Sequence, residues 1–206
     1  VDGKLGDWKG VHVFHDEPGD VPDGDIDLES LSVHTTDEGD MYFYLTVRGE
    51  VGEVSKAGYF MFMDIDMDPD TGLDVWGVGA EFAVRVLVKD GEVISSALYH
   101  LEGLEGDTRQ FVYYMGTVVG VDSGTIEGVV SGFRYKVFGA LAVALDEQGH
   151  MDFSGEVATP SGNTLTVSAR YVIPQVMDTE RSISVLRFTV SGTGTLTAVA
   201  LTAEGT

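Results

Sequence analysis

Apolar and polar residues alternate along much of this chain with the period of two that is typical of β-strands. The alternation is clean at 165–173, 184–190 and 195–202, and an aromatic run at 41–47 follows an acidic turn. We therefore predict strands over these ranges and over a further set, namely 59–65, 81–88, 93–98, 111–114, 125–130 and 134–137.

One segment, 137–147, fits a helix, although Gly139 weakens it and a buried strand is the competing interpretation. The 27 glycines and the many short strands are typical of a β-sandwich. We therefore predict an all-β fold, a single β-sandwich of the jelly-roll or immunoglobulin-like type with at most one short helix. No linker rich in Pro or Ser divides the sequence, so residues 1–206 are expected to form one domain.

The composition narrows the classes of partner. The net charge of -22 argues against nucleic acid and against anionic membrane surfaces, and no apolar stretch is long enough for membrane insertion. There is no cysteine, and metal ions can replace disulfides in extracellular proteins. The chain begins at Val1 rather than methionine, which fits a processed or a trimmed N-terminus. We expect a secreted or cell-surface protein.

The strongest chemical signal is the segment YFMFMDIDMDPDTG, in which a buried strand leads into acids at alternate positions: Asp64, Asp66, Asp68 and Asp70. Carboxylates held this close repel one another unless a cation neutralises them, and oxygen ligands suit Ca²⁺. The spacing is not that of an EF-hand, because a proline replaces its glycine and a valine its glutamate. We predict a calcium loop completed by distant carboxylates or backbone carbonyls. The alternative is a solvated acidic turn.

A second acidic run has the same alternation, with Asp23, Asp25 and Asp27 around a glycine. Three interpretations remain open: a second cation site, further ligands for the first site, or a polar surface loop.

No residue pattern indicates catalysis. The triplets at 70–72 and 122–124 resemble those of aspartic proteases, but they are too close in sequence for a two-lobed enzyme. The histidines show no paired spacing, and nucleophile-elbow and phosphate-binding motifs are absent from the sequence. We predict that the protein is not an enzyme.

Three aromatic residues are candidates for stacking on a sugar: Trp76, just beyond the acidic loop, and the pair Tyr113 and Tyr114. The competing interpretation places the tryptophans in the core or at an edge.

The N-terminal pattern DG-x-x-x-DW, the aromatic strand at 42–44 and the DxDxDPDTG loop occur in this order within about residues 1–90. This order resembles the β-sandwich modules of family 9 carbohydrate-binding modules and DOMON-like domains. The resemblance implies a jelly-roll-like sandwich with structural calcium at the acidic loop. It also implies that Asp2, Asp7 and Trp8 fasten the N-terminal segment to the sandwich.

These observations favour a non-catalytic, calcium-stabilised structural subunit of a cell surface or filament, which self-associates or contacts surface-layer neighbours. Strand addition by the segment 195–202 is one expected route. The alternative function is a carbohydrate-binding module of an extracellular glycoside hydrolase, with a polysaccharide as partner. A third interpretation is a DOMON-like pocket for haem or sugar, in which Met61, Met63 or His100 would be the axial ligand of a haem.

Overall fold

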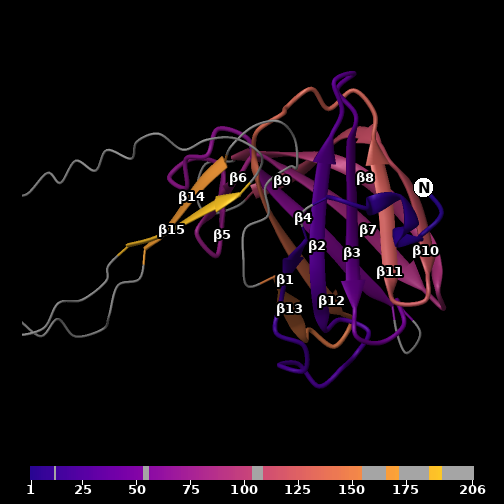
Figure 1. Cartoon of the computed structure of the whole chain (residues 1–206). Helices are drawn as coiled ribbons and strands as arrows, with labels where there is room; N and C mark the ends of the chain where they lie inside the picture. Colours follow the sequence, from indigo (N-terminus) through magenta and orange to yellow (C-terminus); the bar gives the residue numbers. More distant parts are fainter. Residues whose placement is uncertain (12, 53–55, 104–108, 155–165, 172–185, 192–206) are drawn as a thin grey trace, which may run out of the picture. The chain divides into compact units, whose positions relative to one another are not determined.

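Two large antiparallel sheets packed together confirm the predicted β-sandwich in the computed structural model of this chain (Figure 1). The structure describes residues 1–206 apart from 12, 53–55, 104–108, 155–165, 172–185 and 192–206. By its internal contacts the chain divides into two units, Val1–Pro160 and Ser161–Thr206, and each is described by itself.

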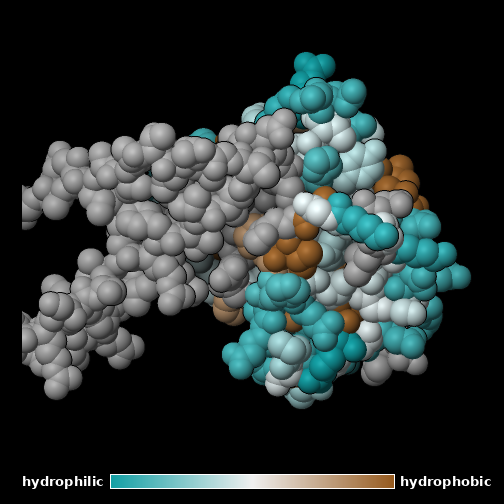
Figure 2. Space-filling view, in the orientation of Figure 1, coloured by the Kyte–Doolittle hydropathy of each residue, from teal (hydrophilic) through white to brown (hydrophobic). Residues whose placement is uncertain are grey.

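The first sheet has five strands in the order β1-β2-β3-β11-β10. A 3₁₀ helix, η1 at Leu5–Trp8, precedes it. The strand bounds are β1 Phe14–His15, β2 Leu28–Thr35, β3 Met41–Val47, β10 Val118–Asp122 and β11 Thr125–Val130. This sheet faces the viewer in Figure 1, and the same side is mainly hydrophilic or intermediate in Figure 2.

The second sheet has six strands in the order β13-β12-β4-β7-β8-β9. A two-stranded hairpin, β5-β6, is inserted between β4 and β7. The bounds are β4 Ala57–Asp64, β5 Leu73–Val75, β6 Val78–Ala80, β7 Phe82–Lys89, β8 Glu92–Gly103, β9 Arg109–Gly116, β12 Gly139–Asp146 and β13 Met151–Phe153.

The core lies between the two sheets and follows the strand alternation. The six-stranded sheet contributes Tyr59, Met61 and Met63 of β4, while the five-stranded sheet contributes Phe43 and Leu45 of β3, all at most 2% exposed. Removing this apolar area from water is the main stabilising term of the sandwich. Since the side chains of Met61 and Met63 are buried in the core between the sheets, neither is available as the axial ligand of a haem.

The segment 137–147 forms a strand rather than a helix. Residues 139–146 are β12, which pairs with β4 along its whole length. Seven of its eight residues are buried, because the sandwich core covers one face and a smaller apolar cluster covers the other. A strand buried on both faces loses the alternation that would distinguish it from a buried helix.

The remaining strand predictions have mixed outcomes. Residues 134–137 are not in a strand, whereas β14 Thr166–Tyr171 and β15 Leu186–Ser191 form an antiparallel pair in the second unit. The predicted strand 195–202 lies outside the described residues. No helix among the described residues is long and apolar enough to cross a membrane.

Candidate metal centre

The acidic loop lies where the end of β4 meets the start of β7. These strands are antiparallel neighbours, with Met63 opposite Phe82, so the residues that follow one strand lie beside those that precede the other. The Glu81 N–H donates to the Met63 carbonyl oxygen over 3.0 Å. As a result, Asp64, Asp66 and Glu81 each offer a carboxylate oxygen within 4.8 Å of the other two.

Asp64 is the buried member of this triplet. It is 6% exposed, and its Oδ1 atom has no hydrogen-bond partner among the described residues. Burying a carboxylate oxygen is unfavourable when no donor replaces the hydrogen bonds that it formed with water. A cation placed between the three carboxylates would supply the missing interaction.

Hydrogen bonds fix the other two carboxylates. Glu81 Oε2 accepts the Ile65 N–H over 2.9 Å, while Asp66 Oδ1 accepts the Asp68 N–H over 3.0 Å. The Thr71 hydroxyl lies 3.1 Å from both Asp66 Oδ1 and Glu81 Oε1. The loop therefore holds its oxygen ligands in position without a bound ion, as a preorganised cation site does.

The electrostatics of the triplet oppose ionisation. Burial raises the pKa of Asp64 to about 6; the Met67 N–H lowers it, and the charges of Glu81 and Asp66 raise it further. The ionisation of Asp64 beside the other two carboxylates is therefore unfavourable. All the ligand atoms are oxygens, so the site suits a hard divalent cation, and Ca²⁺ accepts such irregular geometry more readily than Mg²⁺.

The predicted ligands Asp68 and Asp70 lie on the exposed side of the same loop and do not belong to the triplet. Asp68 Oδ1 accepts the Asp70 N–H over 3.1 Å, which stabilises the turn. The loop packs closely on β6 at Gly79, where an added Cβ would lie 2.5 Å from the Asp68 carbonyl oxygen. Of the four predicted acids, the structure brings Asp64 and Asp66 together, and Glu81 takes the third position.

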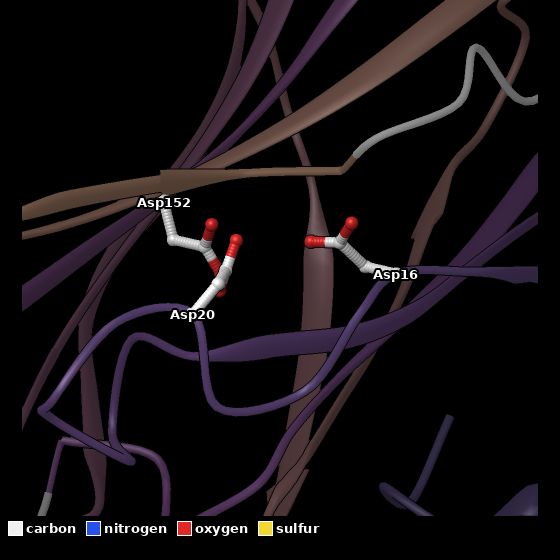
Figure 3. Close-up of side chains that lie close together, drawn as sticks. All are labelled: Asp16, Asp20 and Asp152. Carbon is white, nitrogen blue, oxygen red and sulfur yellow. The ribbon is translucent and has the colours of Figure 1, made fainter.

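A second triplet joins the edges of the two sheets. Asp16 and Asp20 come from the loop between β1 and β2, and Asp152 comes from β13, the edge strand of the other sheet (Figure 3). Their carboxylates point toward one another, with one oxygen of each within 4.8 Å of the others. These residues are also able to hold a cation.

Asp152 already has two backbone donors, which distinguishes it from Asp64. Its Oδ2 accepts the Leu28 N–H over 2.7 Å and its Oδ1 accepts the Phe153 N–H over 2.8 Å. Burial raises the pKa of Asp152 to about 6; these N–H groups lower it, and the charges of Asp20 and Asp16 raise it. Hydrogen bonds thus support this carboxylate without an ion, although its neighbours still repel it.

No family model, curated protein or solved structure matches this chain.

The second predicted acidic run forms a turn, and neither triplet includes its acids. Asp23 accepts the Asp25 N–H over 3.2 Å. Asp27 is fully buried, accepts the Gly19 N–H and pairs with Arg48, whose Nε lies 3.1 Å from Oδ2. The charge of Asp27 is thus compensated within the chain.

The three predicted sugar-binding aromatics do not share one face. Trp76 is at the tip of the β5-β6 hairpin, where positive φ angles at Trp76 and Gly77 suit a two-residue turn. Its indole is 52% exposed and stacks on Phe153. Tyr113 contacts Tyr99 on the outer face of the six-stranded sheet. Tyr114 packs instead against the core residue Phe82.

Sequence reasoning missed Glu81 and Asp152 as site residues. Glu81 carries a signal, since an acid stands directly before a buried strand that follows the acidic loop. Asp152 has none, because it is a single acid in a three-residue strand and meets Leu28 from 124 positions away.

Proposed function

We propose that this chain is a non-catalytic, calcium-stabilised β-sandwich that serves as a structural subunit of a secreted or cell-surface assembly. The observation that carries the proposal is the buried Asp64 Oδ1 atom, which faces Asp66 and Glu81 and has no hydrogen-bond partner among the described residues. Since the sequence has no cysteine, a bound ion replaces the cross-link that a disulfide would give.

The energetic effect of the ion follows from mass action. A ligand that binds only the folded chain, at about a hundred times its dissociation constant, stabilises it by about 2.7 kcal/mol. For a chain of this size, that stabilisation raises the melting temperature by roughly 5–10 °C. The ion also ties the end of β4 to the start of β7, which stiffens one end of the sandwich.

Thermal melting in EDTA and in CaCl₂ tests the cation site, with MgCl₂ as a third condition. We expect the largest rise with calcium, and loss of that rise in Asp64→Asn and Glu81→Gln. Glu92→Gln, which removes an exposed charge from β8, is the matched control and keeps the full response. An unchanged calcium response in both site variants would falsify the proposal.

The assembly part of the proposal requires its own measurement. We expect self-association that depends on calcium, because the ion orders one end of the sandwich. Size-exclusion chromatography with and without EDTA, followed by electron microscopy, measures it. A monomer in both conditions, with no ordered particles, contradicts a structural subunit while leaving the cation site intact.

The alternative function, a carbohydrate-binding module, has weaker support. Trp76 is exposed, as a stacking platform requires, but Tyr114 lies on the other face of the sheet. The three residues therefore do not build one platform. Affinity electrophoresis against a polysaccharide panel, with Trp76→Ala as the variant, decides this alternative.

A further inference from the structure

The outer face of the six-stranded sheet is apolar, although the outward face of a sandwich sheet is commonly polar. Phe60 and Phe62 of β4 point outward, as do Leu141 and Val143 of β12. The β5-β6 hairpin covers part of this face through a second apolar cluster that includes Val75. The hairpin leaves the rest of the face open among the described residues.

The uncovered part is a groove of about 380 Å³. Its lining is chiefly the outward rings and chains of Phe60, Phe62, Trp76, Phe111 and Leu145. A separate, smaller hollow of about 240 Å³ shares Phe60 and Leu145 with it and is otherwise lined in part by the charged residues Lys56, Asp146 and Glu147. A volume of this size is within the range of small-molecule sites, and the lining favours an apolar body.

Arg85 is the one charged residue among the described residues that line the groove. It donates from Nη2 to the Tyr99 hydroxyl over 2.5 Å and stacks 4.6 Å above the centre of that ring, which fixes the guanidinium. Its Nε atom is buried without a hydrogen-bond partner. None of the ion pairs between described residues includes Arg85.

We propose that this groove binds a small amphiphilic carboxylate, with its apolar body on the phenylalanine rings and its carboxylate at Arg85. The charges are complementary, because a planar guanidinium that forms no ion pair with the described residues is matched to a carboxylate. A neutral sugar fits less well, since its hydroxyl groups would lose water and meet few polar partners in this lining. A cationic amphiphile would place like charges together.

The test is isothermal titration of the full chain, in calcium, with three probes that share one tail: octanoate, 1-octanol and octyltrimethylammonium. We expect octanoate to bind at least about tenfold more tightly than octanol, because a charged hydrogen bond is added. The net charge of -22 attracts the cationic probe to the protein non-specifically, so a preference for the anion identifies Arg85 as the cause. Equal binding of all three probes, tighter binding of the cation, or no binding overturns the proposal.

Three variants separate head-group recognition from tail recognition. We expect Arg85→Gln to abolish the preference for octanoate over octanol. We expect Phe111→Ala to lower the affinity for both probes by the same factor. Arg134→Gln removes an exposed cation outside the groove lining and changes neither. Since Phe111 is partly exposed, its variant folds even where Arg85→Gln does not. Full octanoate preference in a folded Arg85→Gln, or unchanged affinity in Phe111→Ala, contradicts the site.

Two further measurements exclude other occupants. The first is sedimentation of the ligand-free chain. If it shows a dimer, and if Phe111→Ala dissociates that dimer, the groove binds a second copy of the chain and the proposal is overturned. The second is competition with soluble glucans. If a glucan displaces octanoate, the groove binds a sugar, and the proposal is again overturned. Asp64→Asn leaves octanoate binding unchanged, so failure of the calcium site and failure of the groove are distinguishable.

Discussion

The Asp152 carboxylate on β13 accepts a hydrogen bond from the Leu28 N–H at the start of β2, with 2.7 Å between Oδ2 and N. Asp152 is on β13, an edge strand of the six-stranded sheet, and Leu28 begins β2 outside the short pairing of β2 with β1, so one buried side chain joins the two layers here. This link closes the side of the sandwich on which Asp16 and Asp20 also lie.

Replacement of Asp152 tests the contribution of this link. Asp152→Ala leaves the N–H groups of Leu28 and Phe153 without acceptors, so we expect a loss of about 2–3 kcal/mol in the free energy of unfolding. Asp152→Asn keeps one acceptor and loses less. Urea denaturation measures both, and Met151→Ala, at the exposed neighbour, is the control. A loss under about 0.5 kcal/mol in Asp152→Ala would show that the link is dispensable.

The raised pKa of Asp64 predicts an unusual pH dependence in metal-free buffer. Between the ordinary value of 3.8 and about 6, the folded chain retains a proton that the unfolded chain has lost. The corresponding stability is complete below pH 4 and is lost as the pH rises through 6, with a magnitude of at most about 3 kcal/mol.

Chemical denaturation in EDTA between pH 4 and 7.5 measures this loss as a difference between the native chain and Asp64→Asn, which has no titrating group at that position. Calcium should cancel the loss above pH 6, because the ion pairs with the ionised form. Parallel pH profiles for the two chains would refute the assignment to Asp64.

Gly79 sets how closely the acidic loop approaches β6. Gly79→Ala places a Cβ 2.5 Å from the Asp68 carbonyl oxygen and 3.0 Å from Pro69, so the loop must move outward. We expect a loss of about 2 kcal/mol together with a smaller calcium-dependent rise in melting temperature. Gly116→Ala, where the nearest atom is 3.7 Å away, is the matched control and shows neither effect.

Glu127 holds the N-terminal segment on the five-stranded sheet. This buried carboxylate accepts the Asp2 and Gly3 N–H groups at 2.7 and 3.1 Å and the Trp8 indole N–H at 3.0 Å. We therefore expect Glu127→Ala to lower the free energy of unfolding by about 3 kcal/mol and to increase amide hydrogen exchange over residues 1–11. Trp8→Phe retains an aromatic ring against Tyr44 but loses one hydrogen bond. We expect it to lower the free energy of unfolding by about 1 kcal/mol. Equal losses in the two variants would contradict this assignment.

The sequence predicted the sandwich because strands such as β3 and β11 alternate between side chains that face the core and side chains that are only partly buried. The ranges 41–47 and 125–130 coincide with β3 and β11, whose alternation ends at turn residues. The pattern failed where that condition does not hold. β12 is buried on both faces, and β13 is three residues long, too short for any period to be visible.

Only those residues of the candidate site that are close in sequence could be predicted. Asp64 is the last residue of β4 and Asp66 follows two positions later, so their proximity is evident from the sequence. Glu81 joins them because β4 and β7 pair in one particular register, and Asp152 meets Leu28 through the packing of two sheets. Register and sheet packing depend on the whole core, which no short motif encodes.

On β12, Ala140, Ala142 and Ala144 face the core, while Leu141, Val143 and Leu145 face outward. Enlarging one of the alanines would force the two layers apart, so these positions tolerate little change over evolutionary time. Leu141 and Val143 are also confined, because they are buried in the second apolar cluster, whereas Leu145 lines the open groove, which accommodates a larger or smaller side chain. Descendants of this chain can therefore vary what the depression accepts and still inherit the same architecture.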